Sequence, residues 1–249
     1  DEQQAEGEGI DIVLCLDVSG SMMAQDLSPN RLEAAKAVAI DFISSRKADR
    51  IGLVIFSGES FTQCPITTDY GVLKQQVQSI SSGLLEPGTA IGSGLSTSVD
   101  RLKNSKAKSR VIILLTDGVN NGGLIDPITA KEIAKAFRIK VYTIGVGTDG
   151  YAPVPVNSSM GVILEQEKVN IDEKLLKAIA NETGGNYFRA KDNESLKNIY
   201  SEIDKLEKSK VQILTTYRFS EKFFPFVLIA LIAIFIEVLL TTMVFRKFP

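Results

Sequence analysis

Oxygen-bearing side chains follow two apolar runs of this chain at the points where strands are expected to end. The stretch "IVLCLDVSGSM" passes from an apolar run directly into Asp17, Ser19 and Ser21. A second apolar run, "RVIILLTD", ends in Asp117. Carboxylate and hydroxyl oxygens are hard ligands, which suit Mg²⁺ or Mn²⁺ better than zinc. The spacing therefore indicates an oxygen-ligated metal site.

The composition excludes several other kinds of site. The chain has no His, which excludes a Ser-His-Asp triad and any His-ligated zinc or iron centre. The formal net charge of -2 offers no basic excess for nucleic acid, so we expect no nucleic-acid partner. Cys15 and Cys64 lack a CxxC spacing, and we interpret them as two buried thiols.

Strand-like and helix-like segments alternate along the chain. Continuous apolar runs of the kind that form strands buried on both faces occur at 10–17, 50–57, 110–117 and 140–147. Only two residues separate the second run from "SFTQCPIT", so that segment must pair antiparallel, and Pro65 suits an edge strand. The pattern predicts an α/β fold with a doubly wound, mostly parallel central sheet, one antiparallel edge strand and helices on both faces.

This fold predicts that the two aspartates meet. Doubly wound sheets bind ligands at the carboxyl ends of strands where the strand order reverses, and Asp17 and Asp117 would lie side by side there. Two carboxylates with no His or Lys between them repel each other unless a cation or proton separates them. A further oxygen is expected from Thr89 in "EPGTAIG", although a threonine at that place could instead cap a helix.

These motifs together resemble the von Willebrand factor type A (VWA) domain. The features are a DxSxS sequence, a threonine in a "GTAIG" loop and an aspartate in "LLTDG", and the resemblance covers roughly residues 8–207. It implies a Rossmann-like VWA fold and a protein-binding module without catalysis. It further implies that Mg²⁺ (or Mn²⁺) accepts a Glu or Asp of a protein partner at its open position. The metal-ion-dependent adhesion site (MIDAS) would comprise Asp17, Ser19, Ser21, Thr89 and Asp117.

The chain resembles more closely the BatA group of bacterial aerotolerance (Bat) proteins. The resemblance rests on "IDIVLCLDVSGSM", "DRIGLVIFSGESFTQCPIT", "KSRVIILLTDGVNN" and an apolar segment near the end of the chain. It implies a bacterial inner-membrane complex with other Bat-type membrane proteins, a connection to a MoxR-type ATPase, and a role in aerotolerance or oxidative stress. Members of the group also have membrane helices before the domain. Since the chain starts at Asp1 rather than Met, we expect a fragment or a processed product.

The apolar segment from Phe223 to Phe245 is predicted to cross a membrane. Its 23 residues contain one charge, Glu237, and at about 1.5 Å per residue they would exceed a bilayer core of about 30 Å. Because a carboxylate inside a membrane usually faces protein, Glu237 is a candidate contact with another membrane helix. The predicted divisions are a lead-in (1–8), the domain (9–207) with an inserted loop or hairpin (151–170), a linker (208–222), the span (223–245) and a tail (246–249).

The side of the membrane is indicated by the flanking charges. Arg246 and Lys247 favour a cytoplasmic C-terminus and an external domain, whereas Arg218 and Lys222 on the other flank favour the opposite orientation. We expect the domain on the periplasmic side of the inner membrane.

Two other functions are compatible with the residues. In the first, a metal-dependent phosphotransfer enzyme, Asp17 would be the nucleophile, but Ser19 stands where related phosphatases carry a second acid. The second is a structural membrane scaffold that uses no metal. The stretch "GVGTDG" (145–150) fits a dinucleotide-binding pattern, but prolines rather than a helix follow it, so we expect a tight turn there.

Overall fold

The computed structural model describes residues 9–158, 161–214 and 224–239. The chain separates into two compact units, Asp1–Val211 and Gln212–Pro249.

The first unit is built on a six-stranded sheet with the strand order β3-β2-β1-β4-β5-β8. Strand β3 pairs antiparallel with β2, and every other neighbouring pair is parallel. The predicted mostly parallel sheet with one antiparallel edge strand is confirmed. The strands are β1 (Asp11–Asp17), β2 (Arg50–Phe56), β3 (Ser60–Thr67), β4 (Arg110–Thr116), β5 (Lys140–Val146) and β8 (Tyr187–Ala190).

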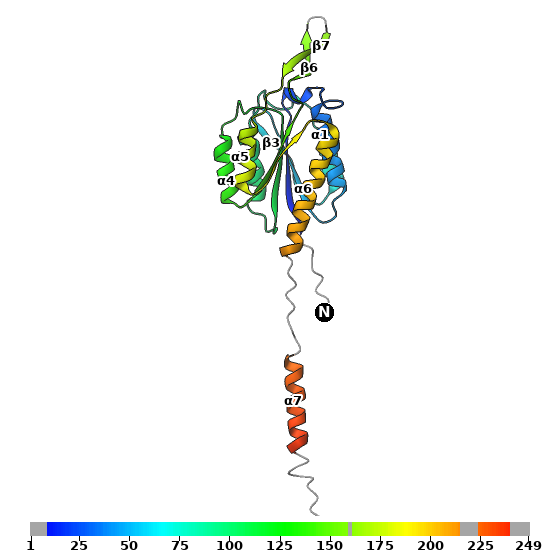
Figure 1. The fold of residues 1–249 in the computed structure, drawn as a ribbon, viewed down its shortest axis with the longest axis vertical. Coiled ribbons are helices and arrows are strands. Elements are labelled where there is room, and N and C mark those ends of the chain that lie inside the picture. The colour runs from blue at the N-terminus through cyan, green and yellow to red at the C-terminus, as the bar shows by residue number, and fades with distance from the viewer. Residues whose placement is uncertain (1–8, 159–160, 215–223, 240–249) are drawn as a thin grey trace, which may run out of the picture. The chain divides into compact units, whose positions relative to one another are not determined.

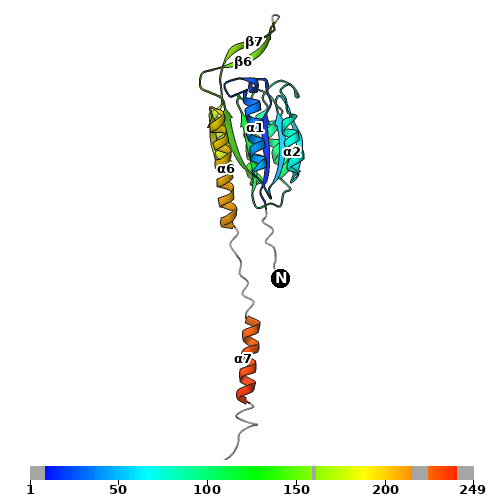
Figure 2. The ribbon, with the colours of Figure 1, turned by 90° about the vertical axis from the view of Figure 1, so that its right-hand side faces the viewer.

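Helices cover both faces of this sheet, as expected for strands that are apolar on both sides (Figure 1). Alternate residues of β1 point to opposite faces, so Leu14 packs in the core beneath α1, α2 and α6, whereas Val13 packs beneath α3, α4 and α5. Figure 2 shows α1, α2 and α6 on one face. The helices are α1 (Arg31–Ser44), α2 (Tyr70–Gln78), α3 (Ile91–Leu102), α4 (Pro127–Ala136), α5 (Glu173–Thr183) and α6 (Asn193–Leu214).

The strand order places the ends of β1 and β4 next to each other. Leu16 lies opposite Leu115 in the parallel register of β1 and β4, so Asp17 and Asp117 lie together at the carboxyl ends of these strands. Cys15 and Cys64 are buried free thiols, as interpreted from the sequence.

A separate two-stranded hairpin occupies the region that the sequence left open as a loop or hairpin. Strands β6 (Tyr151–Ser158) and β7 (Gly161–Lys168) pair antiparallel and form their own sheet. Figure 1 shows that this hairpin extends past the ends of the main-sheet strands. Its base packs on the domain through Ala152 and Val154, which form a small apolar cluster with Ala24.

The second unit contains helix α7 (Phe224–Leu239), whose side chains from Phe226 to Leu239 are exposed. Across the described ranges, no helix combines the length and apolar character needed to cross a membrane. The predicted span of 223–245 is therefore not confirmed, and its residues 223 and 240–245 lie outside the described ranges.

A buried carboxylate fastens α6 to the sheet at the end opposite the candidate site. Glu207 is 2 % exposed and accepts hydrogen bonds from Ser109 Oγ (2.7 Å), Tyr142 Oη (2.6 Å) and Lys140 Nζ (2.9 Å). Burial alone would raise the pKa of Glu207, but these three donors outweigh it and lower the pKa below its ordinary value. The ionised carboxylate therefore stabilises the folded domain.

We expect Glu207→Gln to lower the free energy of unfolding by about 1–3 kcal/mol at neutral pH, since the ion pair with Lys140 is lost. A lowered folded pKa contributes stability above the unfolded pKa of about 4.3, and this contribution disappears as the pH falls through the folded value. Urea unfolding from pH 7 to 3 should show the wild type and variant converging. Exposed Glu202→Gln is the control, and a difference that stays constant with pH would contradict this account.

Candidate metal centre

Asp17 ends β1 and is held rigidly at the centre of the candidate site. Its side chain is fully buried, its Oδ1 accepts the Ser19 backbone N–H at 2.9 Å, and its Oδ2 accepts the Thr116 hydroxyl at 2.6 Å. Thr116 is the last residue of β4, so this bond joins the two strand ends directly. The carboxylate is oriented by one neighbour along the chain and one across the sheet.

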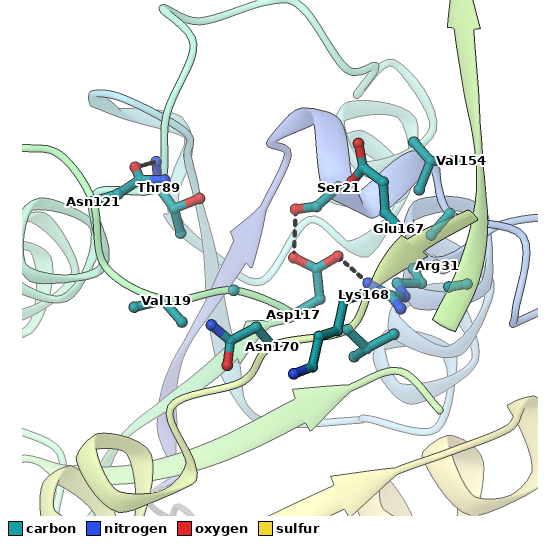
Figure 3. A pocket seen from close by; sticks show the side chains of 14 residues that line it. Ser21, Arg31, Thr89, Asp117, Val119, Asn121, Val154, Glu167, Lys168 and Asn170 are labelled. Atoms are coloured by element: carbon teal, nitrogen blue, oxygen red, sulfur yellow. Dashed lines mark hydrogen bonds and ion pairs between the residues drawn. The ribbon is translucent and has the colours of Figure 1, made fainter. Parts of the chain in front are cut away.

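The two serines and Asp117 form a compact row of oxygens. A short 3₁₀ turn, η1 (Gly20–Met23), brings Ser21 back over Ser19, and their hydroxyl oxygens lie 3.1 Å apart. Ser21 Oγ donates to Asp117 Oδ1 at 2.7 Å (Figure 3). Octahedral Mg²⁺ with ligands at about 2.1 Å has neighbouring ligand oxygens about 3 Å apart. The two spacings in this row are therefore close to that between neighbouring ligands of magnesium.

Thr89 approaches from the loop that precedes α3. In Figure 3 its hydroxyl lies on the side that faces Ser21 and Asp117. Thr89 does not cap the helix, which was its alternative role, because Ala90 occupies the N-cap position of α3. The Ile91 N–H at the start of α3 donates instead to Asn120 Oδ1 at 2.9 Å.

Two asparagines that the sequence reasoning missed hold the Thr89 loop. Asn121 Oδ1 accepts the Thr89 backbone N–H at 2.7 Å, and its neighbour Asn120 bonds the start of α3. Both follow Asp117 in "LLTDGVNN", and Asn side chains in a loop commonly bond backbone groups. That tendency was the available signal, but it does not identify the partner.

Arg31 is the main residue that the sequence reasoning missed. It begins α1 and is 3 % exposed, and its Nη1 donates to Asp117 Oδ2 at 2.6 Å. The same guanidinium bonds both oxygens of Asp26, at 2.7 and 2.6 Å. The sequence reasoning considered only His and Lys beside the two aspartates and did not consider this arginine. A cation in the first turn of a helix opposes the helix dipole, and this was the signal for another role.

The glycine-rich stretch "GVGTDG" supports Arg31 rather than a nucleotide. A Cβ atom on Gly147 would lie 2.7 Å from Arg31 Nη2, so only glycine lets the guanidinium approach this closely. Thr148 donates to Asp26 Oδ2 through its backbone N–H at 2.8 Å and its hydroxyl at 3.1 Å. Strand β6 begins at Tyr151, so a turn and a strand follow this motif rather than a helix, in agreement with the expected tight turn.

The electrostatics of the site favour a bound cation. Burial, and secondarily the charge of Asp117, raise the pKa of Asp17 to about 7. Burial also raises the pKa of Asp117, although Arg31 opposes the shift. The Arg31 guanidinium pairs with Asp26 and Asp117, and Asp17 is the third carboxylate nearby, bonded to Ser19 and Thr116 instead. These three carboxylates and one guanidinium leave an excess of two negative charges when all are ionised. A divalent cation would balance that excess.

A metal at this place would need hydroxyl ligands as well as the aspartates. Within the described ranges, no group of three or more His, Cys, Asp or Glu side chains is arranged to hold a metal ion. The donor set of two carboxylates and three hydroxyls has the chemistry of a magnesium site rather than a zinc site. The residues present therefore fit the metal that the sequence predicted.

A cavity of about 230 Å³ opens directly over these oxygens. Its floor includes Ser21, Thr89 and Asp117, and the base of the β6–β7 hairpin forms a wall with Val154 and Lys168 (Figure 3). A side chain from another molecule could enter this space and reach the row of oxygens.

Residues 11–202, which carry the sheet and all five candidate ligands, match the von Willebrand factor type A domain. The chain belongs to this family. A crystal structure of an aerotolerance-related membrane protein from Bacteroides fragilis is 31% identical, with a TM-score of 0.68 over 78% of this chain and 98% of that chain. BatB from Bacteroides thetaiotaomicron is 34% identical, also with a TM-score of 0.68, over 80% of this chain and 100% of that chain. The predicted resemblance to Bat-type VWA proteins is confirmed.

A relative of this VWA chain is also found among bacterial proteins of greater length. An uncharacterized protein of Borreliella burgdorferi is 35% identical over 201 residues, which are 80% of this chain and 59% of that protein. The chain spans about three fifths of the length of the curated relatives that it matches first.

We expect Arg31→Ala to lower the free energy of unfolding by about 3–5 kcal/mol, because it leaves Asp26 and Asp117 buried without their cation. Arg31→Lys should recover only part of the loss, since an ammonium does not reproduce the forked geometry. Urea unfolding at pH 7 measures both. Arg101→Ala, at an ion pair that is about two-fifths exposed, is the matched control and should change stability by less than about 1 kcal/mol. Equal losses at positions 31 and 101 would contradict the role given to Arg31.

Proposed function

We propose that this VWA domain binds a protein partner through a divalent metal held at a MIDAS. The ligands are Asp17, Ser19, Ser21, Thr89 and Asp117, and the metal is Mg²⁺, with Mn²⁺ as a substitute. The observation that supports this most directly is the excess of two negative charges beside a row of oxygens at 2.7 and 3.1 Å spacing. Membership of the VWA family supports a role in protein interaction.

Each residue has a distinct task in this proposal. Asp17 is fixed by Ser19 and Thr116, while Asp117 is fixed by Ser21 and Arg31. When bound, the metal supplies an electrophilic centre with an open coordination position that attracts a carboxylate. Because the serine and threonine hydroxyls are neutral and Arg31 shares the charge of Asp117, the site would still attract a Glu or Asp from the partner.

We propose that the protein acts at a bacterial inner membrane. The similar Bacteroides fragilis protein is an aerotolerance-related membrane protein, and helix α7 of this chain is apolar over most of its length. We propose that 223–245 anchors the chain, with the domain on the periplasmic side. By resemblance, the partners are other Bat-type membrane proteins and a MoxR-type ATPase, in a complex linked to aerotolerance or oxidative stress.

Catalysis fits the geometry less well than binding. Both oxygens of Asp17 accept short hydrogen bonds and its side chain is fully buried, so it is poorly placed to attack a phosphoryl group. A metal-independent scaffold would have to relieve the buried excess of negative charge by protonating an aspartate, for which the raised pKa of Asp17, about 7, leaves little margin at neutral pH. We therefore propose a binding module that performs no reaction.

We expect calorimetric titration of the full chain in mild detergent to show one Mg²⁺ site. Asp17→Ala should weaken Mg²⁺ binding by more than about tenfold. Removing a residue that merely orients a metal ligand already costs about that much affinity, and Asp17 is itself a proposed ligand. Ser21→Ala should also weaken binding, and it removes only one hydroxyl if Asp17→Ala proves unstable. Ser60→Ala removes a hydroxyl bonded to Thr97 outside the site and should bind as the wild type does. Equal Mg²⁺ affinity in all four proteins would refute the proposal.

We also expect Glu237 to contribute to association within the membrane. Glu237→Leu should reduce the size of the complex purified in mild detergent, because a carboxylate in an apolar helix is stabilised by a polar partner. Ile236→Leu on the same helix is the control. Unchanged size, measured by sedimentation, would remove Glu237 from the interface.

A further inference from the structure

The two edges of the β6–β7 hairpin differ in their hydrogen-bonding groups. The Val169 N–H bonds the Gly150 carbonyl at 2.8 Å, which fixes that pair as a hydrogen-bonded pair of the antiparallel ladder. Such pairs alternate with non-bonded pairs, whose backbone groups point away from the partner strand. By the observed register, Pro153 with Gln166 and Pro155 with Leu164 are non-bonded pairs. Their backbone groups therefore point outward.

The outer edge of β6 is closed to another strand. Of the four outward positions of β6, the two in the middle are Pro153 and Pro155, which have no N–H to offer. The outward carbonyl of Pro153 is already taken by the Gln25 N–H at 2.9 Å, which ties β6 to the body of the domain. The middle of this edge therefore cannot pair with a further strand.

The outer edge of β7 is open by the same reasoning. Leu164 and Gln166 direct both N–H and C=O outward, and no proline interrupts β7. Leu164 is 55% exposed, and an exposed apolar residue on an edge strand invites pairing with another chain. The charged residues Glu165, Glu167 and Lys168 of β7 oppose indiscriminate pairing but leave the backbone groups of the edge available. Natural proteins normally block such an edge, as β6 does here.

The open edge leads to the candidate metal site. Lys168 ends β7 and lines the cavity whose floor includes Ser21 and Asp117 (Figure 3). Lys168 lies on the same side of the strand as Leu164 and Gln166, because side chains alternate along β7. An extended segment paired with β7 would therefore lie beside the apolar Leu164 first and beside the cationic Lys168 next, and would then reach the cavity.

We infer that β7 is a docking strand for an extended segment of the protein partner, which adds to the open edge and carries a carboxylate beside Lys168 into the cavity. Acidic character follows from the proposed metal and from Lys168, which shares a face of β7 with Leu164 and Gln166, whereas Glu167, which also lines the cavity, lies on the opposite face. The inference rests on the proposed function in that respect. Backbone pairing supplies affinity that is largely independent of sequence, while the carboxylate supplies selectivity.

A pair of variants at one position tests the edge. Leu164→Pro removes the outward N–H without removing a bond to β6, and the residue opposite is itself a proline. Leu164→Ala removes the same side chain but keeps the N–H. The probe is a displayed library of random dodecapeptides selected on the full chain in mild detergent with Mg²⁺. The strongest selected peptide should bind Leu164→Ala within about threefold of wild type and Leu164→Pro about tenfold more weakly or worse. The thermal unfolding of Leu164→Pro should match that of Leu164→Ala.

The outcomes separate this inference from the proposed function. Selected peptides that require Asp17 and Mg²⁺ but bind Leu164→Pro as well as wild type would overturn the docking strand and leave the metal-dependent function standing. Binding that is lost in Leu164→Pro but unchanged in Asp17→Ala would support the docking strand and overturn the metal-dependent function. Failure to enrich any peptide with an acidic residue would overturn the inference. So would a dimer of the full chain that Leu164→Pro converts to a monomer, because the occupant would then be a second copy.

Discussion

The repulsion between two buried carboxylates at neighbouring strand ends is the constraint on which the rest of the site depends. Asp17 and Asp117 are brought together because β1 and β4 are adjacent and parallel. The folded chain manages their charges with short hydrogen bonds from Ser21 and Thr116 and with the buried guanidinium of Arg31. These contacts reduce the excess negative charge without removing it. The remaining charge is the reason for proposing a divalent cation at this site.

The same contacts connect the site to the hairpin. Arg31 bridges Asp117 to Asp26, and Asp26 accepts two hydrogen bonds from Thr148, which lies just before β6. Ser21 belongs to the turn whose final neighbour, Ala24, packs against Ala152 in the hairpin base. Asp117 is thus linked through Arg31 and Asp26 to the turn that precedes β6. The hairpin is accordingly part of the site's surroundings, not a separate appendage.

The opposite end of the domain is stabilised in a different way. There, Glu207 is ionised and fully satisfied by three donors, so it strengthens the fold without creating a charge excess. Buried acidic side chains therefore have different roles in this domain, depending on the charges around them. The VWA fold itself is shared with relatives of known structure, and a fold alone does not assign a function. The charge imbalance at Asp17 and Asp117 carries the functional argument.

Local pattern alone determined much of this protein. Apolar runs long enough to be buried on both faces predicted the parallel strands, and the short link before β3 required its antiparallel pairing. Those two facts were sufficient to place Asp17 beside Asp117, since strand ends in a doubly wound sheet share one edge. Arg31, Asn121 and the open edge of β7 could not be predicted in this way. Arg31 meets Asp117, which lies 86 residues away in sequence, and Asn121 meets Thr89, which lies 32 residues away. The open edge of β7 depends on which residues of β6 and β7 lie opposite each other, and only the folded register shows this. Charge balance and edge accessibility are properties of the assembled neighbourhood, so the tertiary structure alone decided them.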